Sequence, residues 1–348
     1  MMRGSRSLIL FAFLTSSQAF AHVKWFQGDR PPLDLAAFFQ PLPLVFSGGI
    51  ALVVAVLWFW QRARGGRGFL PGAEFFNAAL DRRMGLYGFI PAILGIHIAV
   101  PLLVAGVTGH LFSPDNELFG GWRPLIGLLE TGIALSLFYG GFARVSALLL
   151  AWLWILGIFI FGLEPMLDNA TMLGFAGFFW LAGRGPISVD RLLFPLLEPS
   201  ADSMAKAVPV LRIGLGLGLV AAAFSEKLAN PALAKMFLEH YPLNFTPSLG
   251  IPIPDNIFVL CAGSVELLVG LCLIFGVFTR EIIVIAWLPI NLTLTIFDWS
   301  ELVGHLPIYG AMALLFVWDS SSQNLELWVK GLRMGPLGID SKTGQKQI

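Results

Sequence analysis

Two glutamates at matched positions are the residues of this sequence best suited to buried acid–base chemistry. Glu130 opens the stretch ETGIALSLFYGGFAR, Glu266 opens ELLVGLCLIFGVFTR, and the two stretches align at a constant offset of 136 residues. Each glutamate stands about ten residues before a Gly-aromatic-Arg turn, which on a helix is roughly 15 Å and near the middle of a ~30 Å membrane core. A carboxylate at that depth is costly, so we expect both to face a partner or a polar cavity.

Each of these glutamates has a basic candidate partner on the preceding helix. His97 is predicted to lie at the depth of the first glutamate, and Arg212 to reach toward the second. Such pairs either tie helices together or accept and return protons beside a ligand, and the sequence leaves both interpretations open. Glu226 and Lys227 lie at the far end of the apolar stretch that carries Arg212, and they are expected instead to extend to the membrane surface.

A second candidate site precedes the last apolar stretch of the chain. Asp298, Glu301 and His305 have the spacing i, i+3, i+7, which places them on one face of a helix. Two carboxylates and an imidazole could bind a divalent metal or relay protons. The alternative is a solvated loop, because polar residues outside a membrane are commonly exposed.

The first 21 residues have the pattern of a secretory signal peptide. Arg3 and Arg6 precede an apolar run, and residues 19–21 read Ala-Phe-Ala, an A-x-A cleavage motif. Cleavage there would make His22 the first residue, and its free amine and imidazole could chelate copper. The alternative is an ordinary residue after a cleavage site.

The composition identifies a polytopic membrane protein. Of the 348 residues, 56% are hydrophobic and 13% are charged, whereas soluble proteins carry about 25% charged residues. The formal net charge is zero, so no nucleic-acid partner is expected. Nine apolar spans are predicted at residues 43–60, 86–111, 122–139, 143–162, 167–183, 208–226, 257–276, 281–297 and 303–318.

The distribution of basic residues predicts the orientation. With the mature N-terminus outside, nine spans place the C-terminus in the cytoplasm. Fifteen of the 22 Lys and Arg residues then fall inside and five outside, as the positive-inside rule requires. We therefore expect a multi-pass protein of a bacterial-type inner membrane.

The repeated stretch predicts two parallel four-helix units. An even number of spans per unit gives both units the same orientation, so an axis along the membrane normal should relate them. In the first helix of each unit the offset is 117 residues, which aligns Pro114 with Pro231 and His110 with Lys227. The expected organisation is a signal peptide (1–21), a segment with the first span (22–85), the first unit (86–185), a linker (186–207), the second unit (208–320) and a C-terminal tail (321–348).

The second unit resembles the DoxX family of membrane proteins. The resemblance is carried by RIGLG from Arg212, by Lys227, by GSVE ending at Glu266, by GVFTR ending at Arg280, and by Gly304-His305. It covers residues 208–320 well and 86–185 weakly. The resemblance implies four-helix units, some of which are linked to quinone-reactive oxidoreductases such as the small subunit of thiosulfate:quinone oxidoreductase.

The expected function is that of an accessory membrane subunit of a redox or respiratory system. It would bind a quinone or a similar lipophilic ligand near the two buried glutamates, in contact with the lipid bilayer and with other subunits of a membrane oxidoreductase. The sequence has no haem-ligand pair, iron–sulfur spacing or flavin motif, so electrons would come from a partner or from the ligand itself. The alternatives are a transporter or copper-handling protein, and a non-catalytic assembly factor.

Overall fold

The computed structural model describes residues 23–26, 31–71, 80–194, 200–294, 297, 299–317, 329–331 and 333. The predicted signal peptide, His22 and Asp298 lie outside the described residues. Within them the secondary structure is helical, apart from one isolated bridge between His110 and Glu117.

The described helices follow the predicted spans closely. They are α2 (Val23–Phe26), α3 (Leu35–Phe38), α4 (Pro41–Ala63), α5 (Leu80–Thr108), α6 (Trp122–Tyr139), α7 (Ala143–Phe161), α8 (Leu163–Asp168), α9 (Ala170–Ala182), α10 (Val189–Leu193), α11 (Ala201–Ala223), the π-helix η3 (Phe224–Leu228), α12 (Pro231–His240), the 3-10 helix η4 (Thr246–Leu249), α13 (Asp255–Phe275), α14 (Thr279–Thr293) and α15 (Trp299–Val317). Each predicted span coincides with one of α4, α5, α6, α7, α9, α11, α13, α14 and α15.

Five helical segments of the described chain are long and apolar enough to cross a membrane: Pro41–Ala63, Met84–Thr108, Ala143–Phe161, Asp202–Leu228 and Asp255–Phe275. The apolar parts of α9 and α15 are shorter. The prediction of an all-α polytopic membrane protein is confirmed.

The backbone repeats itself at the turn that follows the second helix of each unit. Gly140 and Gly276 end α6 and α13 in the left-handed conformation, with φ of 73° and 68°. Two residues later, Phe142 and Phe278 also have positive φ, 58° and 43°. Non-glycine residues adopt this conformation rarely and at a cost. Its recurrence at the offset of 136 is what a duplicated unit would produce.

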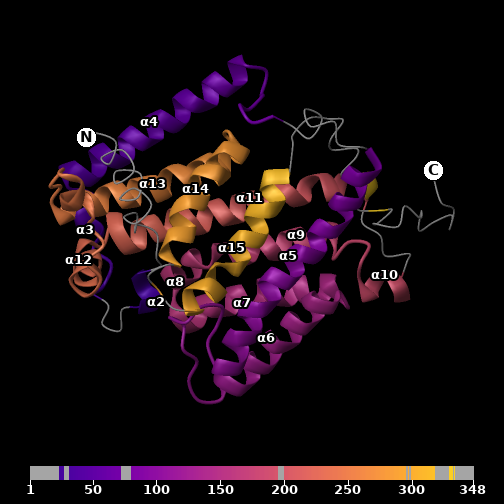
Figure 1. Ribbon diagram of the computed structural model, residues 1–348. Helices are drawn as coiled ribbons and strands as arrows, with labels where there is room; N and C mark the ends of the chain where they lie inside the picture. The colour runs from indigo at the N-terminus through magenta and orange to yellow at the C-terminus, as the bar shows by residue number, and fades with distance from the viewer. Residues whose placement is uncertain are drawn as a thin grey trace, which may run out of the picture.

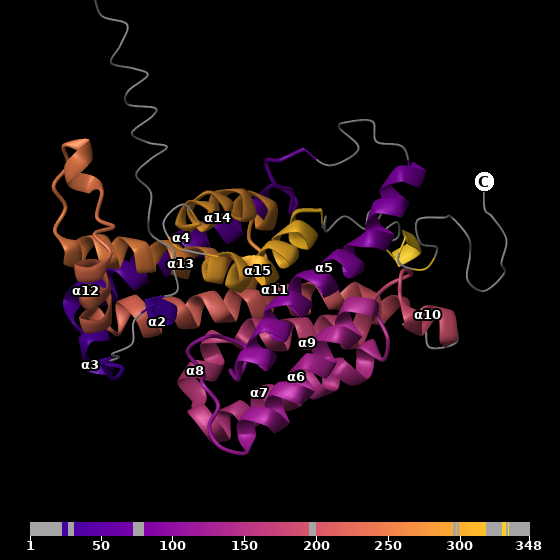
Figure 2. The same ribbon diagram turned by 60° about the horizontal axis from the view of Figure 1, so that its bottom comes forward.

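The eight helices of the two units form a closed ring. α5 packs on α6, α6 on α7, α7 on α9, α9 on α11, α11 on α13, α13 on α14, α14 on α15, and α15 returns to α5. The last helix of each unit therefore packs on the first helix of the other unit, and Figures 1 and 2 show α9 alongside α11 through the middle of the molecule. α4 lies outside the ring, against α13.

The two contacts that join the units are equivalent. A Cβ added to Gly174 of α9 would lie 3.0 Å from Gly214 Cα of α11, and one added to Gly310 of α15 would lie 2.8 Å from His97 Cβ of α5. Gly174 and Gly310 correspond at the offset of 136, and His97 and Gly214 correspond at the offset of 117. Small residues at these crossings let the helices approach closely, as membrane helix pairs do.

Candidate functional site

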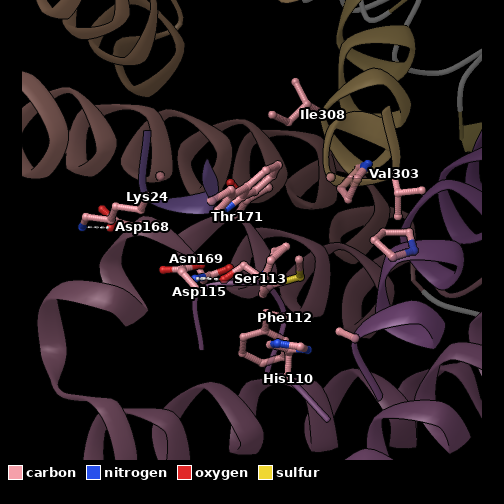
Figure 3. Close-up of a pocket in the computed structure, with 18 of the residues that line it drawn as sticks. Lys24, His110, Phe112, Ser113, Asp115, Asp168, Asn169, Thr171, Val303 and Ile308 are labelled. Carbon is pink, nitrogen blue, oxygen red and sulfur yellow. Dashed lines mark hydrogen bonds and ion pairs between the residues drawn. The ribbon is translucent and has the colours of Figure 1, made fainter. Parts of the chain in front are cut away.

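A cavity of about 290 Å³ lies where the two units meet. Its walls come from α5, α9, α11 and α15, with apolar side chains such as Val104, Leu215, Leu219, Val303 and Ile308. Figure 3 shows Val303 and Ile308 of α15 on one side of the cavity, and Lys24 with its ion pair to Asp168 on the other. The cavity therefore has apolar walls and a charged end. We call the end of the ring that carries α2 and this charge the α2 end.

Lys24 of α2 binds the first unit at this end. Its ammonium group contacts the carboxylates of Glu164 and Asp168, and the Ser225 hydroxyl donates to the second oxygen of Asp168 at 2.8 Å. Asp168 ends α8 and precedes α9, so it lies outside the membrane-spanning helices of the structure although the predicted span began at residue 167. Burial raises its pKa from the ordinary 3.8 to about 6, and Lys24 only partly offsets this. A carboxyl group with a pKa near neutrality can take up or release a proton.

The second unit contributes a buried ion triad beside the same cavity. Lys227 Nζ lies 2.9 Å from Glu266 Oε1 and 3.3 Å from Glu226 Oε2, and the three side chains are almost completely buried. Glu226 also lines the cavity and accepts a hydrogen bond of 3.1 Å from the backbone N–H of Val23. The triad thus connects α2, η3 and α13.

The π-helix η3 explains why two consecutive charged residues both point inward. α11 continues without a break into Phe224–Leu228, where the wider π turn replaces the α-helical one. Such turns are frequent at functional sites. Gly263 of α13 provides the space, because a Cβ there would lie 3.1 Å from Lys227 Cβ. The prediction that Glu226 and Lys227 extend to the membrane surface was wrong.

Arg212 is not the partner of Glu266, contrary to the prediction. Its guanidinium group packs against Gly276, at the opposite end of α13 from the α2 end. In the first unit Arg184 occupies the corresponding place beside Gly140, and it donates to the carbonyl oxygens of Leu137 and Phe138. Both arginines lie at a helix C-terminus, where a positive charge is favourable.

Glu130 is completely buried but has a different partner from the one predicted. It accepts a hydrogen bond of 2.9 Å from the backbone N–H of Phe112, a residue with φ of 66°. His97 hydrogen-bonds to the Ile93 carbonyl oxygen at 2.8 Å and packs against Gly310, so the predicted pairing of Glu130 with His97 was wrong. Glu130 holds in place the loop that carries Phe112 to the cavity wall.

Glu301 and His305 form a pair inside α15. His305 Nε2 lies 3.4 Å from Glu301 Oε1, and both side chains are buried. Trp25 of α2 packs on this part of α15, with its ring 6.2 Å from that of His305. Glu301 and His305 therefore lie on one face of a helix, as predicted. The alternative, that they belong to a solvated loop, is excluded for these two residues. Within the described part of the chain, no group of three His, Cys, Asp or Glu side chains could hold a metal ion.

Four residues of the site were not predicted as such: Lys24, Asp168, Glu226 and Lys227. Lys24 lies in a segment that was interpreted as a connection and Asp168 at the start of the predicted span 167–183, and only tertiary packing brings them to the cavity. Lys227 carried a usable signal, because an uninterrupted helix to Asn230-Pro231 would keep its side chain among apolar neighbours. That signal was outweighed by the expectation that a lysine near a span end reaches water.

Comparison with known proteins identifies one part of the chain. The DoxX family model matches residues 194–298, which include α11, η3, α12, α13 and α14. No curated protein matches the chain. No solved structure matches it either. The matched region holds the triad of Glu226, Lys227 and Glu266, whereas Lys24 and Asp168 lie outside it. The resemblance predicted from the sequence is thus confirmed, and residues 194–298 are a DoxX region within a multi-pass membrane protein.

Proposed function

We propose that this protein binds a lipid-soluble ligand with a hydrogen-bonding head group, of the quinone class, in the cavity between its two units. It would act as an accessory subunit of a redox or respiratory system of a bacterial-type inner membrane, with the α2 end outside and the C-terminus in the cytoplasm. The observation that carries the proposal is the cavity itself, with apolar walls and one charged end.

The lining of the cavity suits a flat apolar ring with polar substituents. Ligand pockets of this kind have mostly apolar walls and a few placed polar groups. The Lys24 ammonium and the Ser113 hydroxyl can donate hydrogen bonds to ring oxygens, while Asp168 and Glu226 can accept or supply protons. A bound quinone would supply the redox chemistry, and this chain would orient the ring and exchange protons with it.

The position of the cavity favours a bound ligand over a transport path. On α5 the lining residues lie between Pro101 and Thr108, and on α15 between Trp299 and Ile308, which in both helices is the part nearest the α2 end. The cavity is therefore confined to one part of the ring. A cavity confined to one end of the ring fits a ligand that enters from the membrane and stays, whereas a transporter needs access from both sides.

The test is to measure ligand binding directly. The protein is purified in mild detergent, co-purifying lipids are identified by mass spectrometry, and a short-chain quinone is titrated by calorimetry. Ala105 lines the cavity, so Ala105→Leu should weaken binding by about tenfold or more by filling it. Ala51 of α4 is exposed and does not line this cavity, so Ala51→Leu provides the control. Absence of a co-purifying quinone together with no titratable binding would refute the proposal.

A further inference from the structure

A second, smaller cavity of about 30 Å³ lies between Glu266 and His305. It separates the ion triad of the second unit from the Glu301–His305 pair of α15. Its remaining walls are apolar and consist of Leu219, Ala222, Val269, Ala286, Ile290 and Ile308. A space of this size holds one or two waters, and buried waters occupy sites that offer polar partners.

We propose that this cavity holds water that bridges the Glu266 carboxylate and the His305 imidazole, and so joins the two buried groups into one proton-exchange network. The network begins at the large cavity with Glu226, passes through Lys227 to Glu266, crosses the water and ends at Glu301. It deepens the proposed function, because it would connect a ligand in the large cavity with a second proton donor, but it does not require that ligand to be bound.

The transfer that this geometry permits involves protons alone. The imidazolium of His305 breaks an N–H bond to the bridging water, the water passes a proton on, and an O–H bond forms on the Glu266 carboxylate. The products are a neutral imidazole and a carboxylic acid, and no electron moves. Glu301, 3.4 Å from His305, stabilises the charged imidazole before the transfer.

The bridging water is surrounded by apolar side chains. Leu219 and Ile308 line both cavities, so they form the wall between them. Among the described residues, the titratable groups near the network come from α2, the loop after α5, α8, η3, α13 and α15: Lys24, His110, Asp115, Glu164, Asp168, Glu226, Lys227, Glu266, Glu301, His305 and Tyr309. A change in the proton occupancy of His305 should therefore alter the titration of Glu266 across the bridging water.

The test is a double-mutant cycle on the full-length protein in phosphatidylcholine vesicles. Glutamate carboxyl carbons are labelled with ¹³C, and solid-state NMR follows the titration of Glu266 with pH. His305→Gln should move the midpoint of this titration by about one pH unit. Ala222→Val fills the small cavity while leaving both titratable groups, so in that background the movement should fall to about a third or less.

Matched controls separate the bridge from general effects. Glu130 is equally buried but has no histidine across a small cavity, so its titration should be the same in every variant. Ala105→Val, which fills the large cavity, should leave the Glu266–His305 coupling intact even though it weakens ligand binding. Loss of the ligand with retained coupling would therefore refute the proposed function alone.

Transfer of magnetisation from water to the Glu266 carboxyl and the His305 ring provides a readout on the unsubstituted protein. This transfer should be observed for both groups. It tests whether the water is present even if the Ala222→Val variant does not fold. No transfer, no movement of the midpoint with His305→Gln, or equal movement in the Ala222→Val background would each overturn the bridge.

Discussion

The two glutamates at the offset of 136 occupy the same place in their units and yet have different partners. Glu130 accepts one hydrogen bond from a backbone N–H, whereas Glu266 is part of an ion triad with Lys227 and Glu226. Both are buried on the second helix of their unit. The comparison shows that the acid has the same place on its helix in both halves, and that the neighbouring segment determines what the acid does.

The difference originates at the end of the preceding helix. α5 ends at Thr108, Gly109 turns the chain with φ of 82°, and His110 then hydrogen-bonds back to the Thr108 hydroxyl at 3.0 Å. α11 instead continues through η3, which carries Lys227, the counterpart of His110, to the buried carboxylate. One additional helical turn thus converts a structural carboxylate into a charged cluster beside the cavity.

The largest expected effect comes from removing the cation of the triad. Lys227→Met leaves two carboxylates buried close together, which should lower the free energy of unfolding by about 3–5 kcal/mol. His110→Ala, at the equivalent position, removes one hydrogen bond and should cost about 1 kcal/mol or less. Chemical unfolding in detergent, followed by circular dichroism, measures both. Equal losses would mean that the two units are energetically alike.

The next effect concerns Asp168, whose counterpart in the second unit is Gly304. Because its pKa is raised to about 6, the folded protein binds a proton on Asp168 more tightly than the unfolded chain does. Its contribution to stability is therefore greatest below about pH 4 and declines as the pH rises through 6, by up to about 3 kcal/mol. Asp168→Asn removes this dependence, so the stability of the variant relative to the unsubstituted protein should increase from pH 4 to pH 7. A constant or decreasing difference would show that Lys24 keeps Asp168 ionised throughout.

Neutralising each glutamate separates their roles directly. Glu266→Gln removes a charged partner of Lys227 and should cost about 2 kcal/mol, because hydrogen bonds to charged groups are the stronger ones. In Glu130→Gln the amide oxygen can still accept from the Phe112 N–H, so the loss should be below about 1 kcal/mol. Thermal unfolding of both variants at neutral pH measures these losses. A larger loss of stability for Glu130→Gln than for Glu266→Gln would contradict the charged triad as the site of the stronger interactions.

The smallest effect tests the contact of α2 with the second unit. A Cβ at Gly304 would overlap the Trp25 ring, so Gly304→Ala should displace Trp25 and cost about 1 kcal/mol. Gly132 of α6 has no atom within 4 Å of an added Cβ, so Gly132→Ala should be neutral or slightly stabilising. Limited proteolysis of the N-terminal segment should be faster for the first variant only. Equal rates would argue against docking through Trp25.

The fold was predictable because its signals are local. Hydropathy located the helices, and the repeated Gly-Phe-Arg turn predicted two like units whose turns share left-handed backbone conformations. The burial of Glu130 and Glu266 also followed from their places on apolar helices, whereas Glu301 and His305 were expected at the outer face and are buried as well.

The partners were not predictable because they depend on how helices end and how units cross. Arg212 was assigned to Glu266 on depth alone, but it serves the helix C-terminus at Gly276, as Arg184 does from a different position at Gly140. His97 was assigned to Glu130, but the crossing of α5 and α15 places it against Gly310. Hydropathy carries no information on either arrangement.

The closed ring also bears on how such a chain is assembled. Neither half is complete by itself, since α9 is covered by α11 and α15 by α5. A single half released from its companion would expose two long faces that match those of another half. Separately expressed halves should consequently associate in the membrane and rebuild the ring.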